Sequence, residues 1–432
     1  MIPEEVATGR FTKSLKLPEQ GIERGGSVMP SALEGIRVID LTQYQQGPYA
    51  TMMLADMGAD VIKVEQRGTG DPGRKLGPLW PGGTPAFFEA NDRNKKSITV
   101  DLRKEKGKEI IFRLVKGADV FAQNFRPGVA NRLGFGYEAI SGINPGIVYL
   151  TGSAFGLKGP MGKSPGYDGV GQAMSGLLDM TYTPAGIPPA GLGFSIADQS
   201  AAFQLAFGAM VALFQRERTG VGQQVDTSLL GSTMNLIGWT FQSHLVPGGK
   251  AKRFVMPRAR LTQLRTEAGV TSSHYAKDGK PVMILMIGRE WQVKGFKVLG
   301  LEGFIDDPRF ATGEKVIENR EALLTAMDER IATKTRDEWL ALFDEGGAIA
   351  APINTPAEAA EHPQVVANDY IVEIDHPDEG KIKVFGLPVK LHKTPGRVGI
   401  APKLGEHTDQ ILAELGGYTA EEIARLRQEE VI

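Results

Sequence analysis

The chain has 432 residues, of which 41% are hydrophobic and 23% are charged, a composition typical of a folded protein with two domains or one elaborated domain. The formal net charge of -2 provides no overall field for nucleic acid, so an anionic ligand would need a local basic patch. There is no cysteine, which excludes disulfides, thiolate metal ligands and a cysteine nucleophile.

The N-terminal residues 1–32 are rich in glycine, proline and charge and lack periodicity, so we expect a loose tail. Glu4 and Glu5 open the chain, which argues against a signal peptide, and no continuous apolar run reaches the length of a membrane span. We therefore expect a cytoplasmic protein that binds neither membrane nor nucleic acid.

Apolar runs and helical patterns alternate through the first half of the chain. Strands are expected at 35–41, 60–65, 97–100, 118–121, 146–150 and 224–227, and helices at 47–57, 104–116, 199–218 and 229–244. This alternation is typical of a parallel sheet with helices on both faces. We expect an α/β fold with a large, Rossmann-like domain.

The pattern changes after residue 250. A hairpin-like turn at Lys277–Lys280 and charged helices, one of them at 319–334, predict a second, smaller α+β domain inserted into the first. Near the end, Lys381–Phe385 is a candidate to return to the sheet, and two helices begin near Thr408 and Thr419, the latter with a capping box. The expected division is a large domain at 33–228, a linker at 229–253, the small domain at 254–337, a linker at 338–351 and the C-terminal part of the large domain at 352–432.

Signatures of common cofactor sites are missing. The first strand–turn–helix unit lies where dinucleotide enzymes hold a pyrophosphate, and Glu65 ends the second strand as their ribose-binding acid does. The turn at Thr42–Pro48 lacks the glycines of G-x-G-x-x-G, which argues against NAD(P). The six histidines have no ligand-like spacing and no elbow motif indicates a serine triad, so we expect no metal and no serine nucleophile.

Carboxylates remain as candidate reactive groups. Asp198 stands at the start of the long helix, where a helix cap is the simpler interpretation because Asp is among the preferred caps. Tyr167 and Asp168 follow a Pro-Gly turn and are ordinary loop residues on the same reasoning. Basic residues are concentrated around the third strand–helix unit: Lys95, Lys96, Arg103, Arg126 and Arg132. They form either an ordinary solvated face or a binding patch for a phosphate-rich ligand.

Short motifs spread from Leu33 to the end of the chain resemble one known family. They are Leu33–Leu41, Gly47–Ala50, Leu54–Glu65, Asn94–Ser97, Asn124–Gly128, Arg132–Gly134, Asn144–Pro145, Pro165–Asp168, Ser195–Asp198, Arg218–Gly220, Gly222–Gln223 and Leu404–Thr408. In order and spacing they are similar to the class III coenzyme A transferases, the CaiB/BaiF-like family of formyl-CoA and carnitine CoA transferases. The match is specific because so many motifs keep register.

The resemblance implies that Asp198 is the nucleophile. Its carboxylate would attack the thioester of an acyl-CoA, giving a mixed anhydride and CoA thiolate, and the thiolate would then leave a CoA thioester on Asp198. An acceptor carboxylic acid would reverse these steps, with water excluded throughout. Coenzyme A enters as part of the substrate, so no separate cofactor is implied.

The resemblance also implies a set of CoA-contacting residues: Gln45, Gln46, Val100, Arg103, Asn124, Phe125, Arg126, Arg132, Tyr167 and Asp168. Formyl-CoA transferases carry an arginine directly after the strand-end glutamate, where this chain has Gln66 and then Arg67, so Arg67 is the candidate for that contact. They also carry a run of glycines early in the small domain. Nothing between Phe254 and Gly269 matches it, which argues against formyl-CoA and oxalate as substrates.

Two other activities remain open. The α-methylacyl-CoA racemases share the fold and have histidine at the position of Tyr167, paired with the equivalent of Asp198. A phenol, whose ordinary pKa is near ~10, is a poor base at neutrality, so Tyr167 favours transfer over racemisation. A member of the family that binds acyl-CoA without catalysis is the third interpretation. The resemblance further implies a homodimer of interlocked, ring-like subunits.

Overall fold

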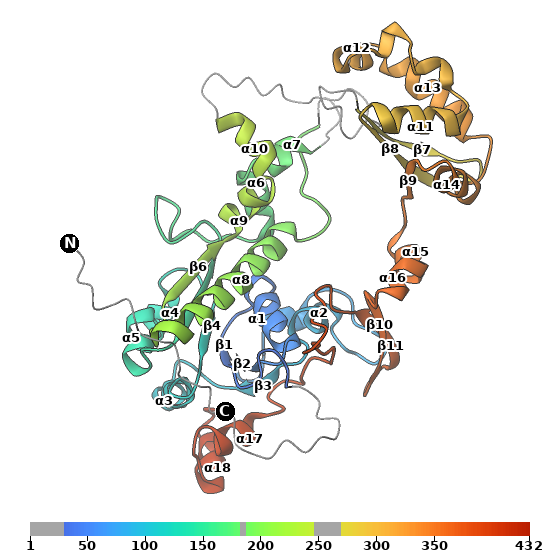
Figure 1. The fold of residues 1–432 in the computed structure, drawn as a ribbon. Helices are drawn as coiled ribbons and strands as arrows, with labels where there is room; N and C mark the ends of the chain where they lie inside the picture. The colour runs from blue at the N-terminus through green and yellow to red at the C-terminus, as the bar shows by residue number, and fades with distance from the viewer. Residues whose placement is uncertain (1–29, 182–186, 246–268) are drawn as a thin grey trace, which may run out of the picture.

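The structure, a computed structural model, describes residues 30–181, 187–245 and 269–432. The tail expected at 1–32 therefore lies almost entirely outside the described residues. Figure 1 shows a large domain built on one sheet and a small domain at the other end of the molecule.

The large domain contains a six-stranded, wholly parallel sheet in the order β3-β2-β1-β4-β5-β6. The strands are β1 (Arg37–Asp40), β2 (Asp60–Glu65), β3 (Lys96–Thr99), β4 (Val120–Gln123), β5 (Val148–Ser153) and β6 (Gln224–Ser228). All residues of β4 and β5 are buried, as expected for parallel strands covered on both faces. The predicted parallel sheet is confirmed. Because the strand order reverses between β1 and β4, their carboxyl ends flank the crevice where open α/β sheets bind ligands.

Helices cover both faces of this sheet. On one face, α1 (Gln46–Asp56) and α8 (Ile196–Thr219) share an apolar core with the strands. On the other face, α3 (Glu105–Val115) and α5 (Tyr137–Ile143) share a core with α17 (Thr408–Glu414) and α18 (Ala420–Gln428). The end of the chain therefore returns to the large domain. Its other helices are α2 (Ala86–Asp92), α4 (Val129–Leu133), α6 (Asp168–Met174), α7 (Leu177–Met180), α9 (Leu229–Leu236) and α10 (Gly238–Leu245).

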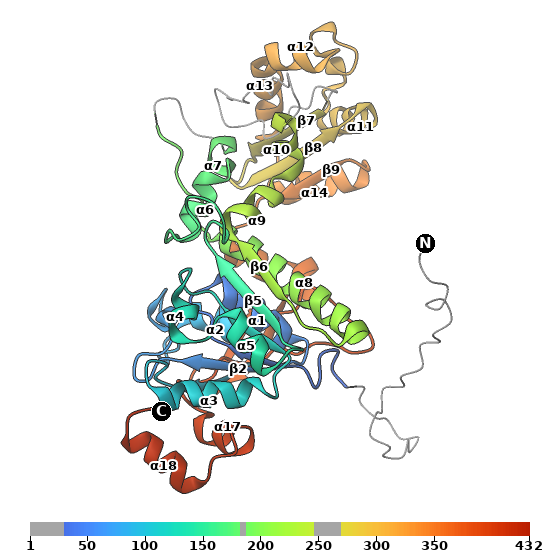
Figure 2. The same ribbon diagram turned by 90° about the vertical axis from the view of Figure 1, so that its left-hand side faces the viewer.

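Among the described residues, α8 is the one helix that is long and apolar enough, by length and composition, to cross a membrane. Half of its most apolar window is buried inside the protein, against α1, β5 and β6 (Figure 2). The buried side carries small residues such as Ala201, Ala202 and Ala209, which allow close packing. Core helices of soluble proteins pass the same test, so the length of α8 is no argument for a membrane span.

The small domain has an antiparallel sheet in the order β7-β8-β9, made of β7 (Gly269–Tyr275), β8 (Pro281–Ile287) and β9 (Ile349–Pro352). The predicted turn at Lys277–Lys280 joins β7 to β8, where Ala276 N–H donates to Lys280 O. The described part of the domain also contains the α-helices α11 (Arg289–Leu299), α12 (Gly313–Glu318), α13 (Arg320–Ile331) and α14 (Arg336–Glu345).

The two expected linkers contain regular structure. Residues 338–351 include most of α14 and part of β9, and they belong to the small domain because Trp339 and Phe343 are buried in its core and β9 pairs with β8. The described part of 229–253 forms α9 and α10, and Leu229 is buried against the start of α8.

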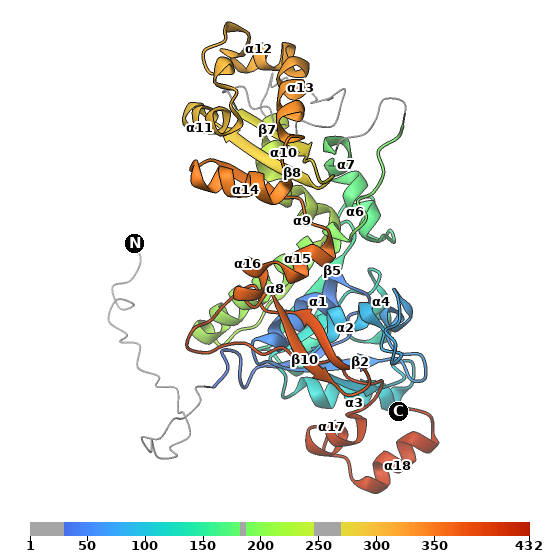
Figure 3. The same ribbon diagram turned by 90° about the vertical axis from the view of Figure 1, so that its right-hand side faces the viewer.

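Residues 381–385 do not return to the parallel sheet. They lie in β11 (Gly380–Phe385), which pairs with β10 (Ile371–His376) in a separate antiparallel hairpin. The residues of β11 are exposed or half-buried, and all six of them are paired with β10, so the hairpin satisfies this strand without the parallel sheet. The chain reaches this hairpin from β9 through α15 (Pro356–Glu361) and α16 (Pro363–Ala367) (Figure 3).

Candidate active site

Two of the expected substrate-binding segments meet at the carboxyl ends of β1 and β4. Asn124, which follows β4, accepts from the backbone N–H of Gln43 (2.7 Å) and donates to its carbonyl oxygen (2.8 Å). Gly152 in β5 completes the junction, because a Cβ there would overlap the Gln46 side-chain carbonyl and lie 3.0 Å from Asn124 Cβ. The side chain of Asn124 thus holds the loop before α1 rather than pointing freely to solvent.

Asp198 lies in the first turn of α8 but does not cap the helix. The capping group is the side chain of Asp168 in α6, whose Oδ1 accepts from the N–H groups of Ala197 (2.7 Å) and Asp198 (3.0 Å). The interpretation of Asp198 as the cap is wrong, because the cap comes from a residue 30 positions earlier. The Asp198 carboxylate takes no part in this cap; it is half-buried and faces the backbone N–H of Gln46.

The surroundings of Asp198 disfavour its charged form. Burial, and then the neighbouring Asp168 carboxylate, raise the pKa of Asp198 to about 7, while the Gln46 N–H acts in the opposite direction. Asp168 is held by its bonds to the helix amides and by Gln172 Nε2, and Gln172 Oε1 in turn accepts from Leu192 N–H (2.9 Å). A carboxylate with a raised pKa is a stronger nucleophile once ionised, and near neutrality it is poised between its two forms.

Tyr167 also reaches the loop before α1. Its ring meets the ring of Tyr44 edge-on, with centroids 5.7 Å apart, and a hydrogen bond between the two phenols raises the pKa of Tyr44. Tyr44 adopts a left-handed backbone conformation (φ 64°), uncommon for a bulky residue. Sequence reasoning missed Tyr44, because nothing in its local pattern sets it apart from Gln45 and Gln46.

The candidate phosphate-binding arginines are exposed. Arg103 pairs with Asp101 (2.9 Å), whereas Arg126 and Arg132 form no ion pair with any described residue. Arg67 lies against the C-terminus, donating to Ile432 O (3.1 Å) and pairing with Glu430 (3.4 Å). Two further expected contacts, Val100 and Phe125, follow β3 and β4, at the same edge of the sheet as Gln46; Val100 is buried and Phe125 partly so.

Three charged residues near these segments are engaged in ion pairs within the protein. Lys95 is buried and pairs with Asp92 (2.7 Å) and Asp40 (3.0 Å), and Lys96 pairs with Asp60 (2.7 Å) at the opposite edge of the sheet. Neither belongs to a basic patch around Arg126. Glu65 accepts two bonds from Arg74 (2.8 and 2.7 Å) and is therefore not free to bind a ribose, in line with the argument against NAD(P).

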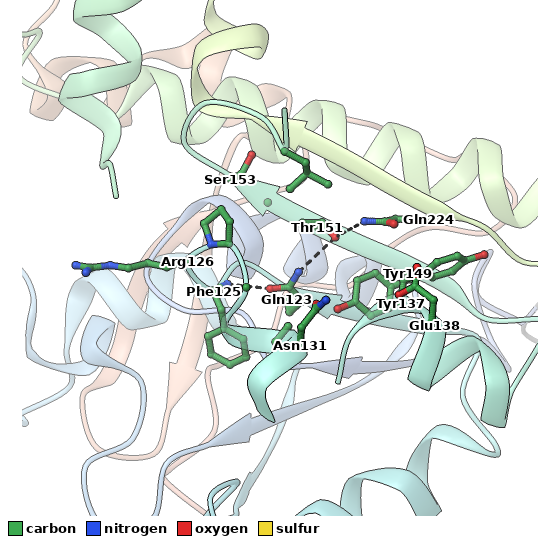
Figure 4. A pocket seen from close by; sticks show the side chains of 15 residues that line it. Gln123, Phe125, Arg126, Asn131, Tyr137, Glu138, Tyr149, Thr151, Ser153 and Gln224 are labelled. Atoms are coloured by element: carbon green, nitrogen blue, oxygen red, sulfur yellow. Dashed lines mark hydrogen bonds between the residues drawn. The ribbon is translucent and has the colours of Figure 1, made fainter. Parts of the chain in front are cut away.

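A cavity of about 210 Å³ lies between the ends of β4 and β5 and the helices α4 and α5 (Figure 4). It is lined mainly by neutral polar and aromatic side chains, among them Gln123, Tyr137 and Thr151, and Gln123 bridges Thr151 Oγ1 (3.3 Å) and Phe125 N–H (3.0 Å). Phe125 and Arg126 lie at its rim, and in Figure 4 the guanidinium of Arg126 points away from the other labelled side chains.

Residues 33–408 match the family described as CoA-transferase family III. The chain belongs to this family. It is 35% identical to succinyl-CoA:glutarate CoA-transferase of Mus musculus, over 91% of this chain and 88% of that protein. It is 33% identical to formyl-CoA:oxalate CoA-transferase of Rhodopseudomonas palustris (strain HaA2), over 92% and 96% of the two chains. The crystal structure of a CAIB/BAIF family protein from Brucella suis superposes with a TM-score of 0.77, at 31% identity, covering 90% of this chain and all of that one.

The family resemblance and the CoA-transferase activity predicted from the motifs are thereby confirmed. The glycine run whose absence argued against formyl-CoA and oxalate falls on residues 254–269, nearly all of which lie outside the described residues. That substrate argument stays a prediction.

One other constellation in this CoA-transferase resembles a hydrolytic triad. In the small domain, Ser272 Oγ lies 2.8 Å from His274 Nε2, and His274 Nδ1 lies 2.8 Å from Asp328 Oδ1. Ser272 is 0% exposed and His274 2%, so no substrate reaches the hydroxyl. The three residues connect β7 to α13 and hold the small domain together.

Proposed function

We propose that this enzyme moves CoA from an acyl-CoA donor to a carboxylic acid acceptor through covalent intermediates on Asp198. The observation that carries the proposal is the geometry around this residue. Asp168 caps α8, and the Asp198 carboxylate takes no part in this cap and faces a backbone N–H at the point where the strand order of the sheet reverses.

The first half-reaction breaks the donor thioester and forms a CoA thioester on Asp198. A carboxylate oxygen of Asp198 attacks the thioester carbonyl carbon, and the C–S bond breaks to give a mixed anhydride and CoA thiolate. The thiolate then attacks the aspartyl carbonyl carbon, which releases the donor carboxylate and leaves a CoA thioester on Asp198. No proton is gained or lost.

The second half-reaction runs the same steps backward with the acceptor. Its carboxylate attacks the aspartyl thioester and displaces the thiolate, which then attacks the acceptor carbonyl and restores the Asp198 carboxylate. Each intermediate stays activated, so little of the thioester energy is lost. The Gln46 N–H faces Asp198 and is suited to stabilise an oxyanion that develops there.

Binding of the CoA portion falls to the carboxyl edge of the sheet. Arg126 and Arg132 are exposed and have no ion-pair partner among the described residues, which suits them to bind phosphate groups. Arg103, which follows β3 and pairs with Asp101, is the third candidate for a phosphate contact. Arg67 must first release the C-terminal segment if it is to bind a phosphate.

For the acyl groups, we propose a dicarboxylic acid acceptor. The relatives named above have glutarate or oxalate in their names, and both are dicarboxylic acids. Because the missing glycine run argues against oxalate itself, glutarate or a similar longer diacid is the proposed acceptor. The direct test is a panel of mono- and dicarboxylic acids with succinyl-CoA and acetyl-CoA as donors. Transfer to glutarate or a similar diacid supports the proposal; transfer only to monocarboxylic acids contradicts the substrate class.

A deuterium-exchange experiment separates CoA transfer from racemisation. A 2-methylacyl-CoA incubated with enzyme in D₂O should gain no deuterium at C2, because Tyr167 stands where racemases have a base. Deuterium incorporation without transfer would contradict the proposed reaction.

We also propose that the active form is a homodimer. Exposed apolar side chains follow one face of α8 at helical spacing, with Phe203 50% exposed, Phe207 71% and Phe214 63%. Apolar patches of this kind mark interfaces. Phe194 lies close to Asp198 in the chain and Tyr167 lies close to it in the fold, and both side chains are exposed. The anhydride and the thioester on Asp198 must nevertheless be shielded from water. A second copy supplies that cover in the proposed dimer.

A further inference from the structure

Five charged side chains are buried together beneath the loop that leads into α1. They are Asp40, Lys63, Asp71, Asp92 and Lys95, here called the lysine–aspartate cluster, and none is more than 4% exposed. Lys63 pairs with Asp71 (2.7 Å) and Asp92 (3.2 Å). Lys95 pairs with Asp92 (2.7 Å) and Asp40 (3.0 Å). One continuous network therefore joins the ends of β1, β2 and α2.

The cluster is bonded to the backbone of residues 42–48. Lys63 Nζ donates to Thr42 O (3.0 Å) and Lys95 Nζ donates to Pro48 O (2.9 Å). Asp40 Oδ1 accepts from Thr42 N–H (2.9 Å), and Asp71 Oδ1 accepts from Tyr44 N–H (3.1 Å). Charged side chains thus fix the loop at both ends and at its centre.

Buried ion pairs of this kind contribute little net stability compared with apolar residues of the same size, because desolvation offsets their attraction. The cluster also holds three carboxylates against two ammonium groups. Burial raises the pKa of Asp92 despite both lysines, and Asp92 Oδ2 has no hydrogen-bond partner.

The backbone of the loop itself needs support. Tyr44 is held in the left-handed region (φ 64°), a conformation that persists only when its surroundings over-determine it. Tyr44 N–H bonds to Asp71, and its neighbours Gln45 and Gln46 are the residues expected to meet the substrate.

We propose that the lysine–aspartate cluster positions residues 42–48, the loop and the start of α1, so that the backbone N–H of Gln46 faces the Asp198 carboxylate. The inference rests on the proposed function of Asp198, and it makes Lys63, Asp71 and their partners positioning residues. Two groups act on Asp198: the Asp168 carboxylate from α6 and the Gln46 N–H from α1. Displacing the loop removes the second and leaves the first, so the pKa of Asp198 should rise.

The main test compares Lys63→Met with the wild type. We expect the pH midpoint of kcat to rise by roughly one unit, because Asp198 loses a hydrogen bond to its charged form. The KM for acyl-CoA should rise as well, by about tenfold, since Gln45 and Gln46 move with the loop. Asp71→Asn is the milder variant; its amide oxygen still accepts from Tyr44 N–H, and it should shift both quantities in the same direction by less.

The matched control is Arg93→Met, which removes another buried ion pair, between Arg93 and Asp56 (2.8 Å), that does not touch the loop. It should lower the melting temperature without moving the pH midpoint. The inference is overturned if Asp71→Asn keeps the wild-type pH midpoint of kcat and the wild-type KM for acyl-CoA. If Lys63→Met folds, it must keep both values as well. A ¹³C NMR titration of the Asp198 carboxyl gives the same comparison without turnover, so a wild type that fails to transfer CoA would refute the proposed function and leave this test intact.

Discussion

At the scale of single residues, Asp198 and Asp168 divide two tasks that the sequence assigned to one side chain. Asp is a preferred cap, so a local reading places Asp198 at the helix start as a cap. The structure uses Asp168 instead, from a different helix, and no local pattern reveals a cap supplied across 30 residues. The motif resemblance did single out both residues, because it rests on many matched positions rather than on local chemistry.

Replacing Asp198, the proposed nucleophile, should lower activity and raise stability. Asp198→Asn is expected to lower kcat by roughly a thousandfold or more. With its pKa raised to about 7, the folded state binds a proton that the unfolded state releases near pH 4, so stability falls as pH rises from ~4 to ~7. At pH 8 the variant should therefore be more stable, by on the order of 1–3 kcal/mol. Urea unfolding at pH 5 and pH 8 measures this gain, which should be larger at pH 8; equal stability of the two proteins at both values would refute it.

Activity should follow the ionisation of Asp198. In the wild type kcat should rise with pH through about 7, because only the carboxylate form attacks. Asp168→Asn retains an oxygen for the helix amides but removes the negative charge, so the midpoint should move to lower pH. An unchanged midpoint in that variant would show that Asp168 does not act on Asp198 through its charge. Asp168→Ala, as a comparison, should lose about 0.5–2 kcal/mol of stability with the cap.

At the scale of elements, the strands of the parallel sheet were predictable because each is a buried apolar run between turn residues. The pairing of the strand at 380–385 was not predictable. Its alternating pattern predicts a strand but not which strand it pairs with, and it pairs with β10 rather than with the parallel sheet. Residues 338–351 were expected to form a linker but belong to the small domain, for a related reason. The sequence of α14 is that of a charged helix, and only the burial of Trp339 and Phe343 in the core of the small domain shows to which domain it belongs. Tyr44 and the lysine–aspartate cluster depend on contacts between distant segments, which no single segment displays.

The junction of β5, α1 and the end of β4 should be sensitive to a single methyl group. Gly152→Ala places a Cβ against the side chains of Gln46 and Asn124, so we expect a higher KM for acyl-CoA with the fold retained. Gly142→Ala in α5 is the matched control, because no atom lies within 4 Å of its added Cβ. That variant should keep the wild-type KM and gain up to ~1 kcal/mol in stability. Equal KM values for both variants would argue against a substrate role for this junction.

At the scale of the whole molecule, two features support the proposed homodimer: the exposed apolar stripe on α8 and the exposed side chains near Asp198. Phe207→Glu should dissociate the proposed dimer, because a charge at the centre of an apolar interface is costly to desolvate. Val366→Glu on α16 replaces a single exposed valine outside the stripe and should leave the dimer intact. Light scattering after size exclusion measures both; a wild-type monomer with full activity would contradict the proposal.

Mass spectrometry of the intact protein is the most direct test of the proposed covalent intermediate on Asp198. Enzyme mixed with acyl-CoA and quenched in acid should carry a CoA adduct, located on the peptide that contains Asp198, and hydroxylamine should convert this adduct to a hydroxamate. Asp198→Asn should carry none under the same conditions. Turnover in the wild type with no adduct, or an adduct on a different residue, would contradict the account.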